Sequence, residues 1–314
     1  MRVLVVGATG VVGRRLVPLL VSTGHDVVGG TTSPTKLAGL EQLGATGVVL
    51  DVLDAEQTRK IVADAAPDAI VHQATALANM KFNPRHFDTI FATTNLLRTA
   101  GTRNLLAAAE ESGVERFVAH SFCGWTFART GGPVKTEEDA LDPNPMKPFT
   151  KTLAAIKELE RLVTDDGGVV LRCGGFYGPG TSLDHDGEQA TMVRKRRLPI
   201  VGDGAGVFSF VHVDDVASAT LAALTRGSGI YNIVDDEPAA ARDWIPYLAG
   251  IMGAKPPIHI PAWLARLAAG ETTVAMMTQA RGGVNAKAKR ELSWKPQYAS
   301  WRDGFAHELG DIAT

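Results

Sequence analysis

The sequence predicts an α/β protein with a doubly wound parallel sheet and a smaller C-terminal lobe. Short apolar runs alternate with helical patterns through the first two-thirds of the chain, and this rhythm breaks after about residue 174. Strands joined by helices at this spacing pair in parallel, with helices on both faces of the sheet. The runs are apolar nearly throughout, as expected of strands that are covered on both faces.

The predicted strands are short and follow one another regularly. They cover residues 2–7, 26–31, 46–52, 68–74, 116–121, 168–173 and 229–234. Between them, the spacing of apolar residues predicts helices such as those over residues 11–22 and 95–112. After the break, Gly and Pro cluster in GGFYGPG and LPIVGDGAG, which is typical of turns and loops.

A glycine-rich loop joins the first predicted strand to the first helix. In GATGVVG, Gly7 permits a tight turn, Gly10 lets the backbone approach a pyrophosphate, and Gly13 lets the helix pack closely on the strand. The N-terminus of that helix attracts phosphate through its free N–H groups and its dipole. Because the strand and helix supply the context that the motif requires, it predicts a dinucleotide-binding Rossmann domain.

The end of the second strand bears on the choice of dinucleotide. NAD-binding domains place a carboxylate there for the ribose hydroxyls, whereas this chain reads TTSPTK. The hydroxyls of Thr32 and Ser33 and the charge of Lys36 suit the additional phosphate of NADP. NADP is therefore the predicted cofactor, and NAD stays open because no arginine completes a phosphate clamp.

Further candidate contacts follow the third and fourth strands. Asp51 lies where a carboxylate can reach the adenine amino group, although it is also placed to cap the helix that begins near Asp54. Small residues after the fourth strand let the backbone pass close to a ribose. The predicted cofactor-binding residues are Gly7, Thr9, Gly10, Val11, Val12, Gly13, Thr32, Ser33, Lys36, Asp51, Val52, Ala74, Thr75 and Ala76.

These motifs divide the chain into two parts. Residues 1–174 form the predicted dinucleotide-binding domain, to which residues 208–234 return. Residues 175–207 and 235–314 form the predicted substrate-binding lobe. A chain of 314 residues with 45% hydrophobic content can bury a full core for such an arrangement.

Composition argues against several classes of function. A formal net charge of −2 gives no field that attracts nucleic acid or a membrane surface, so neither partner is expected. No apolar stretch approaches the roughly 20 residues that cross a bilayer, and the N-terminal apolar run is too short for a signal peptide. The two cysteines, Cys123 and Cys173, cannot form a disulfide framework. We expect a cytoplasmic protein, and no residues have the spacing of a metal site.

Several motifs occur together in a characteristic order: GATGVVG, DVLD, AGTRNLL, RFVAHS, LRCGGFYGPG, GDGAGVFSFVHVDDVA and GIYNIVDDEP. Through them almost the whole chain resembles the extended short-chain dehydrogenase/reductase family, of the NAD(P)-dependent sugar epimerase and dehydratase type. The resemblance implies a seven-stranded doubly wound sheet, an NAD(P) cofactor and oxidoreductase activity. It also implies a possible homodimer, paired through helices that flank the sheet.

The catalytic residues of this family are largely missing at the matching positions. The family uses an asparagine, a serine or threonine, a tyrosine that transfers the proton and a lysine that lowers the tyrosine pKa. The resemblance places Arg98 at the asparagine and Phe122 at the hydroxyl residue. It places Phe149 at the tyrosine and Leu153 at the lysine, and none of the four tyrosines in the chain has a lysine four residues later.

A second departure concerns the substrate. Nucleotide-sugar enzymes of this type bind the substrate diphosphate with an arginine, where this chain has Phe208, and Ser209 follows in place of an aspartate. An aromatic ring in place of a cation suits an uncharged, flat or apolar substrate. The predicted lining of such a pocket is Trp125, Phe127, Phe176 and Phe208.

Hydride transfer requires little from a protein beyond holding the nicotinamide against the substrate in a dry pocket. The sequence therefore predicts an NAD(P)H-dependent ketoreductase for a bulky, largely apolar carbonyl compound, such as a polyketide-type metabolite. The candidate catalytic residues are Ser121, after the fifth strand, and Tyr177, after the sixth, with water or the substrate as other proton sources. Two alternatives stay open: a nucleotide-sugar epimerase or dehydratase, and a catalytically silent NADP-binding redox sensor.

Overall fold

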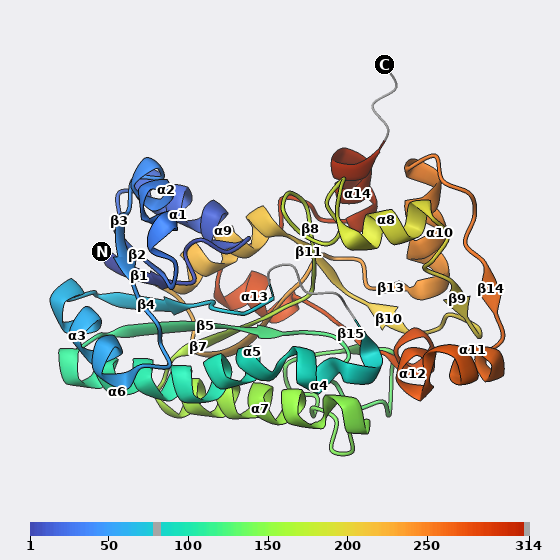
Figure 1. Ribbon diagram of the computed structural model, residues 1–314, viewed down its shortest axis with the longest axis horizontal. Coiled ribbons are helices and arrows are strands. Elements are labelled where there is room, and N and C mark those ends of the chain that lie inside the picture. The colour runs from blue at the N-terminus through green and yellow to red at the C-terminus, as the bar shows by residue number, and fades with distance from the viewer. Residues whose placement is uncertain (78–82, 311–314) are drawn as a thin grey trace.

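The centre of the protein is a seven-stranded sheet in which every neighbouring pair of strands is parallel (Figure 1). The structure is a computed structural model and describes residues 1–77 and 83–310. The strand order is β12-β7-β5-β4-β1-β2-β3. The strands are β1 (Arg2–Val6), β2 (Asp26–Thr31), β3 (Thr46–Val49), β4 (Ala69–His72), β5 (Arg116–Phe122), β7 (Val169–Cys173) and β12 (Gly229–Ile233). The predicted fold class and the seven-stranded sheet are confirmed.

The order of the strands places a crevice next to β1. The chain runs outward from β1 to β2 and β3 and then returns to β4 on the other side of β1. The loops after β1 and β4 therefore lead away in opposite directions at the carboxyl edge of the sheet. In open α/β sheets ligands bind at such a switch point.

Helices cover both faces of the sheet. On one face, α1 (Gly13–Ser22) and α9 (Val213–Ala223) contact each other and share a core with β1 and β7. The other face carries α3 (Ala55–Ala65), α6 (Thr102–Ser112) and α7 (Thr150–Asp165), and Figure 1 shows α6 and α7 running below the strands. The apolar stripe of α7 packs here, so its first turn is carried to the carboxyl edge.

The helix predicted over residues 95–112 is present but interrupted. It consists of α5 (Ala92–Leu96), a π-helical turn (Leu97–Gly101) and α6. Such a turn widens the helix and occurs often at functional sites. The carbonyl of Leu97 accepts a hydrogen bond from His72 Nε2 at 3.1 Å, so a side chain at the end of β4 satisfies one backbone group of the turn.

The remaining segments form a smaller lobe at the right of Figure 1. Its elements are β8 (Gly175–Tyr177), α8 (Glu188–Arg194), β9 (Ile200–Val201), β10 (Val207–Phe208), β11 (Phe210–His212), β13 (Ala239–Ala240), α10 (Ala241–Ile251), β14 (His259–Ile260), α11 (Ala262–Ala269), α12 (Glu271–Gln279), β15 (Gly282–Gly283) and α14 (Trp301–Leu309). Six of its strands form the pairs β8–β11, β9–β14 and β10–β13, outside the large sheet. The seventh, β15, pairs with β6 (Val134–Lys135).

One C-terminal segment packs on the large sheet. Helix α13 (Ala286–Glu291) contacts β12, and Leu292 and Trp294 share the core of α1 and α9. Residues 286–294, which the prediction assigned to the substrate lobe with the rest of 235–314, therefore pack on the dinucleotide-binding domain. The two-part division itself remains a prediction. Among the described helices, none combines the length and the apolar character needed to span a membrane.

Candidate active site

The glycine loop forms a cradle that larger residues would fill. Gly7 has a φ of +85°, and a Cβ there would lie 2.9 Å from the Cα of Ala74. A Cβ on Gly13 would lie 2.3 Å from the carbonyl oxygen of Ala8. The loops after β1 and β4 can therefore approach each other, and α1 can start directly behind β1, only with glycine at these places. Gly10 between them is exposed, which leaves its backbone open to a phosphate.

Hydroxyl groups gather where β2 ends. The hydroxyl of Thr31 is buried and lies 3.2 Å from that of Thr9 in the glycine loop. Thr31 Oγ1 also accepts a hydrogen bond from the backbone N–H of Ser33 at 3.3 Å. Thr32 and Lys36 are exposed beside them. The arrangement agrees with a site for ribose or phosphate oxygens that contains no carboxylate at this strand end.

Asp51 is exposed in the turn after β3. Its Oδ1 accepts from the backbone N–H of Leu53 at 3.0 Å, while Asp54 caps α3 by accepting from the N–H of Gln57 at 2.9 Å. The alternative role of Asp51 as the cap of this helix is therefore wrong, because Asp54 has that position. Val52 is buried, and its carbonyl accepts from Asn104 at 2.8 Å.

The loop after β4 is fixed from two sides. Ala74 faces Gly7, and the N–H of Ala76 donates to Thr94 Oγ1 on α5 at 3.1 Å. Thr75 and Ala76 are exposed, Val11 is half-buried and Val12 belongs to the core. Because β1, β2, β3 and β4 are parallel neighbours, the predicted cofactor residues come together at one edge. Their contact with a dinucleotide remains a prediction that this grouping supports.

Apolar packing surrounds the position where the family's tyrosine is expected. Phe149 and Leu153 are only 2% and 1% exposed. The ring of Phe149 lies 4.5 Å from that of Phe87 and 4.6 Å from that of Trp125, between centroids. We call this group the aromatic cluster; it consists of Phe87, Phe91 and Phe149 with Leu77, Ile90, Trp125, Met146 and Met276 packed against them.

A carboxylate from a distant segment fixes the start of α7. Asp88, in α4 (Phe87–Ile90), accepts from the backbone N–H groups of Lys151 and Thr152, each at 2.8 Å. It also accepts from the hydroxyl of Thr152 at 2.7 Å. A negative charge at a helix N-terminus satisfies free N–H groups and interacts favourably with the helix dipole. The first turn of α7, which carries Leu153 and directly follows Phe149, is held against the aromatic cluster in this way.

Ser121 is tied into a buried ion pair. Its hydroxyl donates to Glu160 Oε1 at 2.7 Å. Arg172 binds the same carboxylate with two hydrogen bonds, of 2.8 and 2.6 Å, and all three side chains are buried. A serine that donates into a buried carboxylate has no proton to offer a substrate. The structure therefore corrects the prediction that Ser121 serves as proton donor.

Tyr177 lies in the interior of the small lobe. Its ring packs against His212 and Phe305, with centroids 5.2 and 5.0 Å away, and the residue is 0% exposed. Burial raises the pKa of the Tyr177 phenol, which makes proton release harder. A substrate cannot reach this hydroxyl, so the prediction of a catalytic role is corrected here too.

The other tyrosines are also engaged away from the aromatic cluster. Tyr231 donates to Glu291 at 3.0 Å, and Tyr247 donates to the carbonyl of Arg302 at 3.0 Å. Tyr298 packs against His212. All four tyrosines of the sequence are among the described residues, and none of them belongs to the aromatic cluster.

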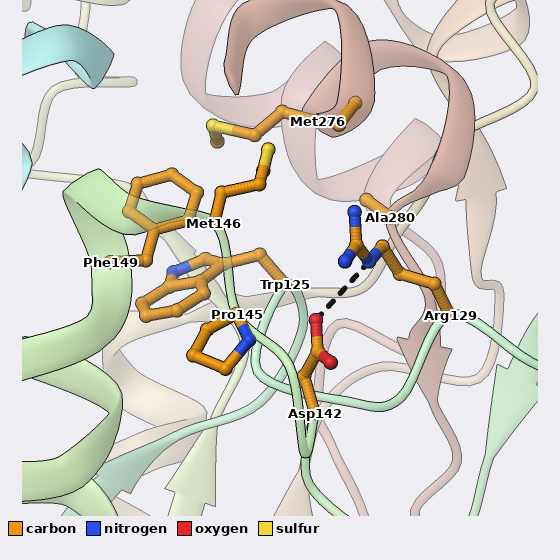
Figure 2. A pocket seen from close by; sticks show the side chains of 9 residues that line it. Trp125, Arg129, Asp142, Pro145, Met146, Phe149, Met276 and Ala280 are labelled. Atoms are coloured by element: carbon orange, nitrogen blue, oxygen red, sulfur yellow. Dashed lines mark ion pairs between the residues drawn. The ribbon is translucent and has the colours of Figure 1, made fainter. Parts of the chain in front are cut away.

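Beside the aromatic cluster lies a small hollow (Figure 2). It is lined by Trp125, Arg129, Asp142, Pro145, Met146, Phe149, Ala275, Met276 and Ala280. Figure 2 shows the rings of Trp125 and Phe149 on one side and an ion pair on the other, where Arg129 Nε lies 3.1 Å from Asp142 Oδ2. The hollow thus offers flat apolar walls and one polar side.

Only part of the predicted pocket lining is correct. Trp125 lines the hollow as predicted. Phe127 is buried in a separate small cluster, and Phe176 packs on the core of the large sheet. Phe208 packs edge-on against Trp244 in the small lobe, 5.7 Å between centroids. Phe208 was predicted from its match to the family's arginine, and Phe127 and Phe176 from their aromatic type; tertiary contacts place all three rings in other clusters.

Comparison with known proteins agrees with this architecture. Residues 3–234 match the model of the NAD dependent epimerase/dehydratase family. The chain belongs to this family. Members of the family and the curated relatives below are named as reductases, epimerases and dehydratases, so the chain is an oxidoreductase of the nicotinamide-dependent type.

Two curated relatives are informative for this epimerase/dehydratase-family protein. A 3-diazoavenalumate denitrifying reductase from a Streptomyces species is 42% identical over 316 residues, which cover 98% of this chain and all of that protein. A ketoreductase from Stigmatella aurantiaca, acting on a farnesylated 3-oxo-dihydroquinoline oxide, is 30% identical and covers 90% of this chain and 83% of its own. Among solved structures, a UDP-glucose 4-epimerase from Thermotoga maritima has a TM-score of 0.74 at 23% identity, covering 98% and 97% of the two chains.

Several residues near the candidate site of this protein were not predicted from its sequence. Phe87, Phe91 and Thr94 are three or four residues apart, so their spacing indicates one face of a helix and could have predicted that they lie together. Met276 comes from α12, late in the chain, and no local pattern connects it with α7. Ser121 and Glu160 are likewise separated by 39 residues, and their hydrogen bond depends on the packing of α7 under β5.

Proposed function

We propose that this protein is an NAD(P)H-dependent reductase that works without a protein phenol and accepts a flat aromatic substrate bearing a diazo group. The observation that carries the proposal is the apolar surrounding of Phe149 and Leu153, where the family has its acid and its lysine. With Ser121 and Tyr177 both engaged elsewhere, the side chains near the hollow suit an acceptor that takes hydride without being protonated.

NADP is the proposed cofactor. The cradle of Gly7 and Gly13 fits a pyrophosphate, and the exposed Thr32 and Lys36 suit a ribose phosphate at the end of β2. When bound, the nicotinamide supplies a hydride. The chain holds it at the carboxyl edge of β1 and β4, next to a region from which the buried aromatic cluster excludes water. Lys36→Glu is expected to shift the preference from NADPH toward NADH, measured as the ratio of the two kcat/KM values.

The proposed substrate site lies at the mouth of the hollow, because the enclosed space of about 20 Å³ is smaller than an aromatic ring. Trp125 and Phe149 offer ring faces to a planar compound, and Met146 and Met276 can adapt to its edge. Arg129 is half-exposed and is held by Asp142 and by the carbonyl of Asn144 at 3.0 Å. This cation faces the hollow from a fixed position, so it can orient an anionic end of the substrate while the apolar end lies against the rings.

A diazo group matches this chemistry better than a ketone does. Reduction of a ketone creates an oxyanion that has to be protonated, whereas a nitrogen of an aromatic diazo or diazonium group accepts hydride directly. Hydride addition to the terminal nitrogen of a diazonium group gives an aryldiazene, Ar–N=N–H. The diazene loses its N–H proton, the carbon–nitrogen bond then breaks with release of dinitrogen, and the ring carbon takes a proton from water, so that the net change is ArN₂⁺ + H⁻ → ArH + N₂. The name of the Streptomyces relative, with its diazo substrate and denitrifying reduction, supports the same class of reaction.

The test supplies NADPH deuterated at C4 with an ortho-hydroxy arenediazonium carboxylate and follows enzyme-dependent NADPH oxidation. The expected result is NADPH oxidation matched by release of dinitrogen and by formation of the denitrogenated arene, whose new ring hydrogen comes from water and is therefore deuterium when unlabelled NADPH is used in D₂O. A reaction without protein corrects for direct reduction by NADPH. Oxidation of NADPH with aryl ketones, and none with the diazo compound beyond that control, would overturn the diazo proposal.

Reduction of a bulky aromatic ketone is the second candidate. The Stigmatella ketoreductase supports it, and a phenol adjacent to the carbonyl of the substrate, or a water, would then provide the proton. Deuterium on a carbinol carbon identifies this activity in the same assay. A nucleotide-sugar epimerase needs a base to start by oxidising an alcohol, which the aromatic cluster does not provide. A redox sensor would bind NADPH and oxidise it with none of these compounds.

A homodimer through the helices below the sheet is also part of the proposal. An open hollow between α5 and α7 is lined by Ala92, Asn95, Leu96, Thr99, Lys151, Ala154, Ala155 and Glu158. Leu96 is 53% exposed within it, which is unusual for a leucine amid small residues. A second copy of the same pair of helices would cover it with two-fold symmetry. A cytoplasmic location remains a prediction.

A further inference from the structure

Arg98 is a buried arginine whose side chain has no hydrogen-bond or ion-pair partner among the described residues. It is 8% exposed, and its Nη1 atom is buried with no hydrogen-bond partner. Its guanidinium lies over the ring of Phe91, 5.9 Å from the centroid, and takes part in no ion pair in residues 1–77 and 83–310. Burial lowers the pKa of Arg98 to about 10. A buried cation left this way is unfavourable for folding, so a reason other than stability is needed for its presence.

The one nearby carboxylate is already used. Glu160 is close enough to favour the charged form of Arg98. Its Oε1 accepts from Ser121 and from Arg172 Nε, and its Oε2 accepts from Arg172 Nη2 at 2.6 Å. Arg172 therefore neutralises Glu160, and the group of three charges keeps a net positive charge. That surplus is located on the guanidinium of Arg98.

The backbone places Arg98 beneath the loop after β4. Thr94, one turn earlier on the same side of the helix, binds the N–H of Ala76 in that loop. Arg98 itself belongs to the π-helical turn, whose carbonyl at Leu97 is bound by His72 at the end of β4. Both contacts fix the guanidinium near the carboxyl ends of β4 and β5. The π-helical turn thus starts a long cationic side chain close to the loop after β4, and its guanidinium lies over Phe91 of the aromatic cluster.

The two halves of the groove lie on opposite sides of β1. The hydroxyls of Thr9 and Thr31 lie toward β2, which is the side expected for the adenosine half of a dinucleotide. The other half then extends over β4 toward β5, where Arg98 lies. Ribose hydroxyls and the carboxamide oxygen of the nicotinamide half are acceptors that a guanidinium can bind with two N–H groups.

We propose that Arg98 is a cofactor-binding residue that donates hydrogen bonds to an oxygen of the nicotinamide half of the dinucleotide. Arg98 provides a fixed positive charge here, whereas Leu153, at the position where the family is expected to have a lysine, provides none. The proposal concerns binding of the dinucleotide and holds whether the substrate is a diazo compound or a ketone.

The test compares Arg98→Met with the unaltered protein in titrations that contain no substrate. NADPH binding, followed by calorimetry, is expected to weaken by about tenfold or more, the size of a lost charge-assisted hydrogen bond. Binding of 2′,5′-ADP, which lacks the nicotinamide half, is expected to stay unchanged. The melting temperature is expected to stay equal or rise, because methionine fills the same space without an unpaired charge.

Arg103→Met is the matched control, since Arg103 lies on the adjoining α6 and pairs at the surface with Glu158 at 2.7 Å. It should leave both ligands unaffected. Arg98→Lys should recover part of the NADPH affinity. Equal weakening of NADPH and 2′,5′-ADP, or unchanged NADPH affinity together with a lower melting temperature, would show that Arg98 has a structural role and would overturn the proposal.

Discussion

The two ends of the proposed dinucleotide groove are built by different means. At the β1–β2 end, the groups proposed to bind the dinucleotide are backbone atoms and hydroxyls, and Gly7 and Gly13 leave space for it. At the β4–β5 end, Phe149 and its neighbours fill the space with rings. A binding loop made of backbone admits few alternatives, whereas side chains on a preserved helix can be exchanged. The comparison shows that one end depends on backbone geometry, which glycine fixes, and the other on side-chain packing, which a preserved helix can carry with different residues.

The largest expected effect tests the β4–β5 end of the groove, where the substrate is proposed to react; we call it the reacting end. Phe149→Ala opens a cavity in the aromatic cluster and should lower the free energy of unfolding by about 3–5 kcal/mol, measured by urea denaturation. Activity per folded molecule should stay detectable, because the ring packs and does not transfer a proton. Phe149→Leu, which keeps more of the volume, should lose less stability. Complete loss of the chemical step in a folded variant that still binds NADPH would show that the ring takes part in the reaction.

A somewhat smaller effect tests the β1–β2 end of the groove, where the glycine loop is proposed to hold the dinucleotide. Gly13→Ala forces a methyl group against the carbonyl of Ala8, so unfolding free energy should fall by about 1–3 kcal/mol and NADPH affinity should fall with it. Gly39→Ala is the matched control, because a Cβ at Gly39, in the helix α2 (Leu37–Gln42), has nothing within 4 Å. This control should leave binding unchanged and slightly stabilise the helix. Normal NADPH affinity in a folded Gly13→Ala protein would contradict the proposed cradle.

The third effect appears only on acidification, and it tests whether water reaches the interior below the end of the groove at β4 and β5. Burial lowers the pKa of His72 to about 4, against 6.5 when unfolded. The unfolded chain takes up a proton that the folded chain refuses, so stability is complete above pH 6.5 and declines toward pH 4, by about 1.4 kcal/mol per pH unit. His72→Gln, which can still donate to Leu97, should decline less on acidification. Equal pH profiles for the two proteins would mean that water reaches this side chain.

The order of the elements could be predicted from the sequence because it depends on local period. Alternating apolar runs predicted the seven-stranded parallel sheet, which the structure has, and the glycine loop lies between β1 and α1 as predicted. The π-helical turn could not be predicted in the same way, since its geometry depends on His72 reaching Leu97 from another element.

The reacting end was harder to predict for a related reason. The sequence places Ser121 and Tyr177 near strand ends, but not the direction that each hydroxyl takes. Ser121 turns toward Glu160, and Tyr177 turns into the small lobe against Phe305. Both outcomes follow from contacts between segments far apart in the chain. Residue type at a matched position predicts that the tyrosine and lysine are absent, and the packing of Phe149 and Leu153 in the part of the chain that the structure describes agrees with that prediction.

The carboxylate of Asp88 has a consequence for how such a site can evolve. It anchors the first N–H groups of α7 from a different segment, so the location of the helix does not depend on the side chain at position 149. Residues at the start of α7 can therefore be substituted during evolution while the helix keeps its position on the sheet. The anchor separates architecture from chemistry, and it makes this surface a suitable starting point for installing a new reaction.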